Sequence, residues 1–486
     1  MSNNLRQKTI SGVIWGFIEK FSLQAFGLIQ GIILARLLMP SDYGLIAMAG
    51  VFLAVSNILI DSGFSSALIR FNKRTNLDYS TVFVINIAIS LVVCSLLCFS
   101  APYIAEFYHE PLLTQIIYVN ALLIFLGSFI SIQRVKMIAE LRFKQKSFMG
   151  IVVTIATGIT AIVMAFLGFG VWSLILPKFM SLCLNLIFYW YYQRWFPGIR
   201  FSWDSCKNLF GFGSKLLASS LINTLYSNIY PLVIGKKFSS VSLGYYTKAY
   251  SYAQLPSTTI TDVIGSVSYP VLSEVQDDEE VLLSVYRRML RVSAYVVFPI
   301  MIGLAAVAHP FIIVLITSKW EACIIYLQIL CFALMLYPLH ALNLQLLKVK
   351  GRSDLFLRLE IIKKIIGIAI LIISVPFGII YMCIGSVFSS YICLAINTYY
   401  TGKVLSYGFM KQMRELAPSY LYSLSMGCIV YLLVYILSDA SVYLQLVLGI
   451  IVGCLFYIAI SIFTKSEDMN YLVYLVKSKI NKSNND

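Results

Sequence analysis

The chain has 486 residues, of which 59% are apolar and only 12% are charged, and its net charge is +15. Soluble domains carry about 45–50% apolar and about 25% charged residues, so this composition excludes soluble enzymes, secreted disulfide scaffolds and disordered proteins. It indicates a polytopic membrane protein, in which Lys and Arg collect in cytoplasmic loops and need no nucleic-acid partner to explain them.

Apolar segments long enough to cross a bilayer recur along the whole chain, since a spanning helix needs about 20 such residues. We predict an all-α polytopic membrane protein with about 14 transmembrane helices. The N-terminal segment MSNNLRQKTISGVIWGF is expected to lead into an uncleaved first span. In chain order the predicted spans are 12–35, 44–68, 80–104, 114–133, 148–168, 171–192, 209–234, 247–272, 292–312, 321–346, 359–377, 379–401, 417–437 and 441–463.

Basic residues are distributed unequally between alternate connections. Twenty-seven of them fall on the side that holds the two termini, and four fall on the other side, namely Arg36, Lys236, Lys237 and Lys319. By the positive-inside rule, both termini are predicted to be cytoplasmic. Residues 70–78 and 139–147 should then lie inside and residues 105–113 outside.

The sequence shows an internal duplication with a spacing of about 200 residues. LARLLMPSDYGLIAMA (34–49) aligns with IGKKFSSVSLGYYTKA (234–249), which pairs Arg36 with Lys236 and Gly44 with Gly244. Six predicted spans precede residue 200 and six more lie between 209 and 401. A parallel repeat of six-helix halves is a transporter architecture with the substrate site between the halves. The expected domains are a bundle at 1–200, a second bundle at 201–405, and two additional helices with a cytoplasmic tail at 406–486.

Polar and charged residues recur at helical spacing in the first span of each half. The spacing of three and four places each set on one helix face. Small and polar residues can simply join helices, but ions at depth are costly and indicate a cavity or a partner. The first set is Gly16, Lys20, Gln24, Gly27 and Gly31, and the second is Lys215, Ser219, Asn223, Tyr226 and Tyr230.

These faces predict a shared central cavity. The predicted substrate-binding residues are Lys20, Gln24, Arg36, Lys215, Asn223 and Lys248.

Three acids fall within or beside the predicted spans. Glu19 lies beside Lys20, Asp61 lies one turn after Asn57, and Asp262 shares a helix face with Lys248. Intramembrane acids commonly bind a coupling ion, so these three are predicted to bind a proton or sodium ion. Glu19 has an alternative role as the partner of a neighbouring lysine.

No residue pattern for covalent chemistry or for a cofactor is present. The three histidines lack ligand-spaced partners, the ten cysteines form no Cys-x-x-Cys pair, and no phosphate-binding G-x-x-x-x-G-K-[ST] loop occurs. We predict no catalytic residue, metal or cofactor, and no enzymatic activity. His340 is expected to be a hydrogen-bonded packing residue, and the acidic run 277–280 to begin a helix.

Six longer stretches carry a family resemblance. They are ILARLLMPSDYGLIAM (33–48), IDSGFSSALI (60–69), LGFGVWSL (167–174), FGFGSKLLASSLINTLYSNIYPLVIGKKFS (210–239), LGYYTKAYSYAQLPST (243–258) and YPLHALNLQLLKVKGRSDLFLRLEIIKK (337–364). The chain resembles the bacterial lipopolysaccharide-biosynthesis flippases, in particular the colanic-acid and teichuronic-acid exporter branch. These belong to the multidrug/oligosaccharidyl-lipid/polysaccharide exporter superfamily. The resemblance runs from about residue 5 to about residue 405.

The resemblance implies two pseudo-symmetric six-helix bundles around a central cavity and transport by alternating access. Its implied substrate is a polyprenyl-pyrophosphate-linked oligosaccharide, carried across the bacterial cytoplasmic (inner) membrane. A polysaccharide polymerase or export machinery is a further implied partner. Lys215 lies in the matched FGFGSK segment, where an ammonium group would attract the pyrophosphate.

Two alternative functions remain open. A cation-coupled drug or small-molecule antiporter of the same superfamily would favour an acidic or aromatic cavity. A polytopic glycan polymerase or ligase would favour a long outer loop with Arg and His.

Overall fold

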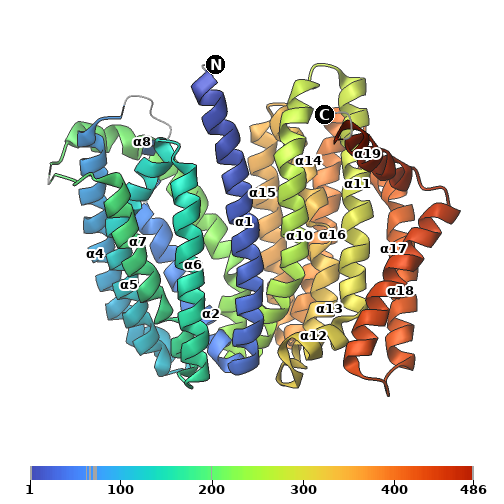
Figure 1. Ribbon diagram of the computed structural model, residues 1–486, viewed down its shortest axis with the longest axis horizontal. Coiled ribbons are helices and arrows are strands. Elements are labelled where there is room, and N and C mark those ends of the chain that lie inside the picture. The colour runs from blue at the N-terminus through green and yellow to red at the C-terminus, as the bar shows by residue number, and fades with distance from the viewer. Residues whose placement is uncertain (1–2, 62, 65–66, 69–73, 199, 484–486) are drawn as a thin grey trace. The chain divides into compact units, whose positions relative to one another are not determined.

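The computed structural model describes the backbone of residues 3–61, 63–64, 67–68, 74–198 and 200–483, and all regular structure in these ranges is helical. Arg70 and Lys73 of the predicted inner connection lie outside the described residues. The chain divides into two compact units, Met1–Gly244 and Tyr245–Asp486. Figure 1 shows long helices in both units.

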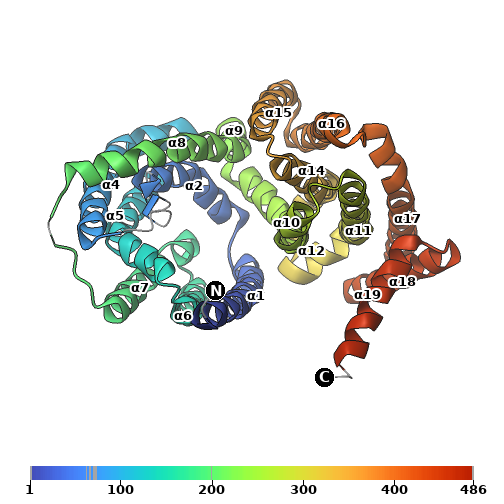
Figure 2. The ribbon, with the colours of Figure 1, turned by 90° about the horizontal axis from the view of Figure 1, so that it is seen from above.

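The first unit consists of helices that pack in a continuous series. In this series α1 contacts α6, which contacts α7, followed by α5, α4, α2 and α8, so that neighbours in space are often distant in sequence. Figure 2 shows these helices from above. The elements are α1 (Asn3–Leu37), α2 (Pro40–Asp61), α4 (Asn76–Tyr108), α5 (Leu112–Ala139), α6 (Phe143–Phe166), η1 (Gly170–Leu174), α7 (Pro177–Gln193), α8 (Trp203–Ser227), α9 (Ile229–Lys237) and the first residues of α10 (Ser240–Glu274).

The second unit is organised around α11, which contacts α13, α14 and α17 and, more narrowly, α18 and α19. The long part of α10 is attached by Ser257, whose hydroxyl donates to the carbonyl of Leu334 at 2.7 Å. The remaining elements are α11 (Glu279–Ala306), α12 (Ala308–Ile316), η2 (Ser318–Trp320), α13 (Cys323–Leu334), α14 (Tyr337–Val349), α15 (Ser353–Ser374), η3 (Val375–Phe377), α16 (Ile379–Leu405), α17 (Phe409–Ile436), α18 (Val442–Phe463) and α19 (Glu467–Ser483).

Local capping explains where two long helices begin. Thr75 forms a capping box at α4, because its hydroxyl accepts from the Asp78 amide while the Asp78 carboxylate accepts from the Thr75 amide at 2.8 Å. Asp278 caps α11 by accepting from the amides of Glu280 and Val281 at 3.1 and 3.0 Å. The prediction that the acidic run begins a helix is therefore confirmed.

The described helices agree with the predicted spans in position. Ten of them combine the length and apolar composition needed to cross a bilayer. The predicted segments at 12–35, 209–234, 247–272 and 359–377 are also helical, as α1, α8, α10 and α15, but they fall outside this group of ten. Three of these four carry the predicted cavity lysines, so the polar residues that indicate function also lower the apolar character of their helices.

A proline closely follows the interruption of four predicted helices, one of which is 171–192, broken at 175–176 before Pro177. The segment 209–234 breaks at Asn228 before Pro231, 292–312 breaks at Val307 before Pro310, and 321–346 breaks at 335–336 before Pro338. Proline lacks an amide proton and its ring clashes with the preceding turn, so it is tolerated only in the first turn of a new helix. Such a break does not exclude a span, since Gly170–Gln193 and Cys323–Val349 each combine the length and apolar composition needed to cross a bilayer.

Candidate functional site

Glu19 is held by α6 and does not stand alone on α1. Lys146 Nζ lies 2.9 Å from Glu19 Oε1, and the Ser147 hydroxyl donates to Oε2 at 2.8 Å. The Glu19 side chain is only 16% exposed. Gly150 lies one turn further along α6, where a Cβ would come within 3.2 Å of the carboxylate. The alternative considered for Glu19, a lysine partner, is therefore confirmed, and the partner is Lys146.

The other polar residues of the α1 face are more accessible. Lys20 is exposed and Gln24 is half-buried. Further along, a Cβ on Gly27 or Gly31 would meet no atom within 4 Å, so the glycines do not mark a close helix contact. Around Gly27 and Gly31, the described part of this face of α1 is open.

Lys215 projects from α8, which a backbone contact positions against α2. A Cβ on Gly63 would overlap the carbonyl of Gly213, which lies two residues before Lys215. Gly63 also has a φ of +71°, a backbone conformation that favours glycine. Leu209 of α8 also joins an apolar cluster with Phe64, Tyr79 and Val82. α8 is thereby packed tightly on one side while its lysine stays exposed.

Within the described residues, Lys215 makes no ion pair or hydrogen bond. The contact between Gly63 and Gly213 brings the end of α2, which carries Asp61, next to the turn of α8 that carries Lys215. Both side chains are exposed. The fold of the first unit therefore combines predicted site residues from both sequence repeats. Asn223, two turns along α8, is exposed as well.

The two duplicated segments contact each other in a reciprocal manner. A Cβ on Gly44 would overlap the carbonyl of Ser240, and a Cβ on Gly244 would overlap the carbonyl of Pro40. Since Pro40 aligns with Ser240 in the repeat, the same position of each repeat faces the glycine of the other. Such exchange is characteristic of a two-fold contact.

The basic residues beside this contact differ. Arg36 is exposed in the last turn of α1. Lys236 instead donates to the carbonyl of Phe107 at 2.6 Å and lies 4.4 Å from the centroid of its ring. The pair that aligns in sequence thus differs in exposure, since Arg36 is exposed and Lys236 is half-buried.

In the second unit, Lys248 is buried, with 9% of its surface exposed. Its ammonium lies 5.6 Å from the ring centroid of Tyr252 and 5.8 Å from that of Trp320, which are cation–π contacts. Asp262, further along α10, is exposed. The two residues share a helix but not an environment.

A buried polar network in the second unit includes the predicted packing histidine. His340 lies 3.3 Å from the Ser390 hydroxyl and 3.0 Å from the Asn397 amide, which confirms that it is a hydrogen-bonded packing residue. The Thr401 hydroxyl donates to Asn343 at 2.8 Å, and Gln412 joins this pair from α17. The link to α17 was not predicted, although the polar residues Asn397 and Thr401, one helical turn apart, are a signal for a buried polar contact.

The described residues contain no group of three or more His, Cys, Asp or Glu side chains that could hold a metal ion. The candidate site residues are cations, amides and carboxylates. Such groups can bind an anionic ligand by charge-assisted hydrogen bonds.

Comparison with known proteins identifies relatives in sequence and in fold. The chain is 27% identical to the lipopolysaccharide biosynthesis protein WzxC of Escherichia coli (strain K12), over 84% of this chain and 82% of that protein. It is 25% identical to the teichuronic acid biosynthesis protein TuaB of Bacillus subtilis (strain 168), over 72% and 73% respectively. The inward closed conformation of the lipid II flippase MurJ has the same fold, with a TM-score of 0.73, 15% identity and coverage of 93% of this chain and 99% of that one.

The profile of a family described as polysaccharide biosynthesis protein matches residues 33–325, more than half of the chain. These residues include five of the six stretches that carry the resemblance wholly or in large part. The predicted resemblance to this group of membrane proteins is confirmed, and the chain belongs to the polysaccharide biosynthesis protein family.

Proposed function

We propose that this protein is a flippase that moves a polyprenyl-pyrophosphate-linked oligosaccharide across the bacterial cytoplasmic membrane by alternating access. The observation that carries the proposal is Lys215, an exposed cation with no acidic partner among the described residues. A lysine that balanced a structural acid would be paired, as Lys146 is with Glu19. An unpaired ammonium on a helix within the membrane protein is suited to an anion that passes it.

Lys20, Gln24, Arg36 and Asn223 are proposed to accompany Lys215 in binding the pyrophosphate and the first sugars. All four lie in the first unit, and three of them are exposed. Lys248 is a further proposed substrate residue, with its charge held against aromatic rings. Cations at low dielectric attract phosphate more strongly than they do in water, which is why a few such residues suffice.

Glu19, Asp61 and Asp262 remain the proposed ion-coupling residues. Asp61 and Asp262 are exposed and therefore accessible to a proton or sodium ion. Glu19 would couple only if its contact with Lys146 opens during transport. The three acids thus differ in how directly they could respond to an ion gradient.

The proposed membrane arrangement has about 14 transmembrane helices and two cytoplasmic termini. It adds α1, α8, α10 and α15 to the ten apolar helices, because all four have at least 22 residues, enough to cross a bilayer. The proposed functional halves are residues 1–200 and 201–405, with 406–486 as two additional helices and a tail. The reciprocal contact of Gly44 and Gly244 supports this two-fold division.

The test uses the full chain reconstituted into liposomes that carry a polyprenyl-pyrophosphate glycan labelled on its sugar. A membrane-impermeant lectin or reductant added outside reports how much glycan has crossed. We expect translocation that depends on the protein, with no efflux of a cationic dye such as ethidium from the same vesicles. Dye efflux without glycan translocation would establish the antiporter instead. Cysteine labelling at position 144 from the periplasmic side would overturn the proposed orientation.

A further inference from the structure

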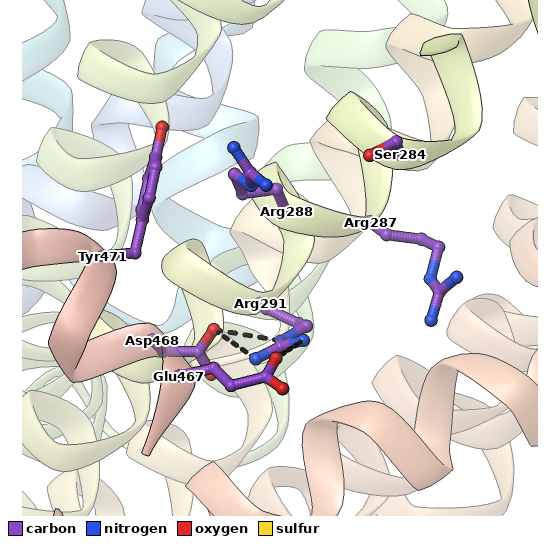
Figure 3. A pocket seen from close by; sticks show the side chains of 7 residues that line it. All are labelled: Ser284, Arg287, Arg288, Arg291, Glu467, Asp468 and Tyr471. Atoms are coloured by element: carbon purple, nitrogen blue, oxygen red, sulfur yellow. Dashed lines mark hydrogen bonds and ion pairs between the residues drawn. The ribbon is translucent and has the colours of Figure 1, made fainter. Parts of the chain in front are cut away.

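A polar pocket lies in the second unit where α11 meets α19. It has a volume of about 200 Å³ and is lined by Ser284, Arg287, Arg288, Arg291, Glu467, Asp468 and Tyr471. Figure 3 shows that α11 contributes the three arginines and α19 the two acids and the tyrosine. None of these residues belongs to the proposed transport site, so the pocket requires a separate explanation.

Two of the three arginines are engaged by carboxylates. Arg291 contacts Glu467 through Nη1 and Asp468 through Nη2, both at 2.9 Å. Arg287 points away from Tyr471 (Figure 3). It pairs with Glu415 of α17. These pairs attach α17 and α19 to α11, and they account for Arg287, Arg291 and Asp468.

Arg288 and Glu467 keep unused bonding capacity. Arg288 lies 4.8 Å from the centroid of the Tyr471 ring and has no carboxylate partner among the described residues. Glu467 is 81% exposed and engages Arg291 through one oxygen, whereas Asp468 is 12% exposed and is contacted by two nitrogens of Arg291. The pocket thus offers one guanidinium for an anion and one carboxylate for a cation. With Glu415 counted, three arginines balance three acids, so a simple anion gains no net attraction.

The surroundings of the pocket are those of a membrane boundary. α18 ends at Phe463, which is 89% exposed, and α19 presents Val473 and Tyr474, which are 38% and 66% exposed. Lys477 lies one turn after these apolar residues and is exposed too. Amphipathic helices that expose apolar side chains and carry basic residues lie in the headgroup region of a bilayer. A ligand that combines a charged headgroup with acyl chains matches this combination.

We propose that the α11–α19 pocket binds the zwitterionic headgroup of a phosphatidylethanolamine lipid. The phosphodiester contacts Arg288 and the hydroxyl of Ser284, which lies one turn earlier on the same face of α11. The primary ammonium donates to Glu467. The acyl chains lie against Phe463, Val473 and Tyr474. The lipid would fasten α19 to the end of the membrane-spanning part of the chain.

The headgroup chemistry makes the proposal specific. Phosphatidylcholine has the same phosphodiester, but its trimethylated ammonium cannot donate hydrogen bonds to Glu467. Phosphatidylglycerol has no cation and would meet the exposed Glu467 with the same sign of charge. Free glycerophosphoethanolamine has the complete headgroup but no acyl chains. These three ligands separate the phosphate, ammonium and acyl contributions.

The test is native mass spectrometry of the full chain in detergent, titrated with each lipid. We expect phosphatidylethanolamine to bind roughly tenfold more tightly than phosphatidylcholine or phosphatidylglycerol, the effect of about one charge-assisted hydrogen bond. Arg288→Gln and Glu467→Gln should each weaken phosphatidylethanolamine binding by roughly tenfold. The matched controls Arg414→Gln and Glu274→Gln alter exposed residues of the same unit outside the pocket and should leave it unchanged.

Equal affinity for the three lipids would overturn the proposal, and so would unchanged binding by both pocket variants. Full competition by free glycerophosphoethanolamine at the same concentration would show that a soluble zwitterion, not a lipid, is the ligand. If either pocket variant fails to fold, Ser284→Ala replaces it and should weaken binding roughly threefold while Glu274→Gln does not. Because the measurement involves no transport, it stays informative even if the flippase proposal fails.

Discussion

The opening helices of the two sequence repeats, α1 and α8, carry lysines at comparable places but treat their charges differently. On α1 the neighbouring acid Glu19 is occupied by Lys146 and Ser147 of α6. On α8, Lys215 has no partner among the described residues, although the helix itself is fixed to α2 through Gly63 and Gly213. Both helices therefore keep an exposed lysine, Lys20 on α1 and Lys215 on α8, but α1 also uses the charge of Glu19 to attach itself to α6.

The largest effect is expected from removing that accessible charge. Lys215→Ala should abolish or strongly reduce glycan export, because losing one ammonium–phosphate contact of about 1.5–3 kcal/mol weakens binding roughly 10- to 150-fold. Lys215→Arg should retain part of the activity, since the charge survives with a different geometry. Export is measured by complementation of a flippase-deleted strain, with membrane levels checked by blotting.

Lys237→Ala is the matched control, because Lys237 is an exposed lysine at the end of α9 in the same unit and has no partner among the described residues. Its export should equal that of the unmodified protein. Normal export by the Lys20→Ala/Lys215→Ala double variant would show that the anion is held elsewhere, and the contrast between α1 and α8 would then have no functional meaning.

Substitutions of Gly44 and Gly244 test whether the two repeats contribute equally to their contact. Gly44→Ala and Gly244→Ala each place a Cβ against a backbone carbonyl of the other repeat, which cannot move as a flexible side chain could. Overpacking of this kind costs about 1–3 kcal/mol, so both variants should unfold at lower temperature in detergent. A similar loss for both substitutions is expected from the two-fold contact.

Gly50→Ala is the control for this pair, since it lies on α2 and its Cβ would meet no atom within 4 Å. It should be neutral or stabilising by about 0.5–1 kcal/mol, because alanine favours the helix. If Gly244→Ala unfolds at the same temperature as Gly50→Ala while Gly44→Ala unfolds at a lower one, the two sides of the contact do not contribute equally to stability.

A smaller loss of stability is expected from the structural acid of α1. Glu19→Gln removes the ion pair in which the Glu19 side chain is 16% exposed and the Lys146 side chain 29% exposed. This substitution should lower the free energy of unfolding by about 1–2 kcal/mol. The control Glu140→Gln breaks a pair with Arg142 that is 33% and 41% exposed, for which about 0–1 kcal/mol is expected. Equal losses in chemical denaturation would remove the distinction between the two pairs.

The smallest change in stability is expected at the accessible acids. Asp61→Asn and Asp262→Asn should alter the free energy of unfolding by less than about 0.5 kcal/mol, since both side chains are exposed. If they bind the coupling ion, each substitution should nevertheless reduce transport driven by an ion gradient in liposomes. Unchanged gradient dependence in both variants would remove these residues from the coupling proposal.

The sequence by itself determined the class of protein, the positions of the helices and the family. Apolar segments of about 20 residues locate helices because a bilayer leaves few alternatives for a polar backbone. The duplicated motif also located Gly44 and Gly244 as related positions before any contact was known. Hydropathy identified α1, α8 and α10 less clearly, because the polar and charged residues on these helices make them less apolar.

The tertiary structure alone decided which charges are paired. Glu19 and Lys146 are 127 residues apart, and helical periodicity does not connect residues so distant in sequence. Lys248 and Lys215 look alike in sequence, yet one is 9% exposed among aromatic rings while the other is exposed on α8. Helical periodicity gives the face on which a side chain lies, but the helix that covers this face depends on packing between distant segments. That packing fixes whether a charge stabilises the fold or stays available to a ligand.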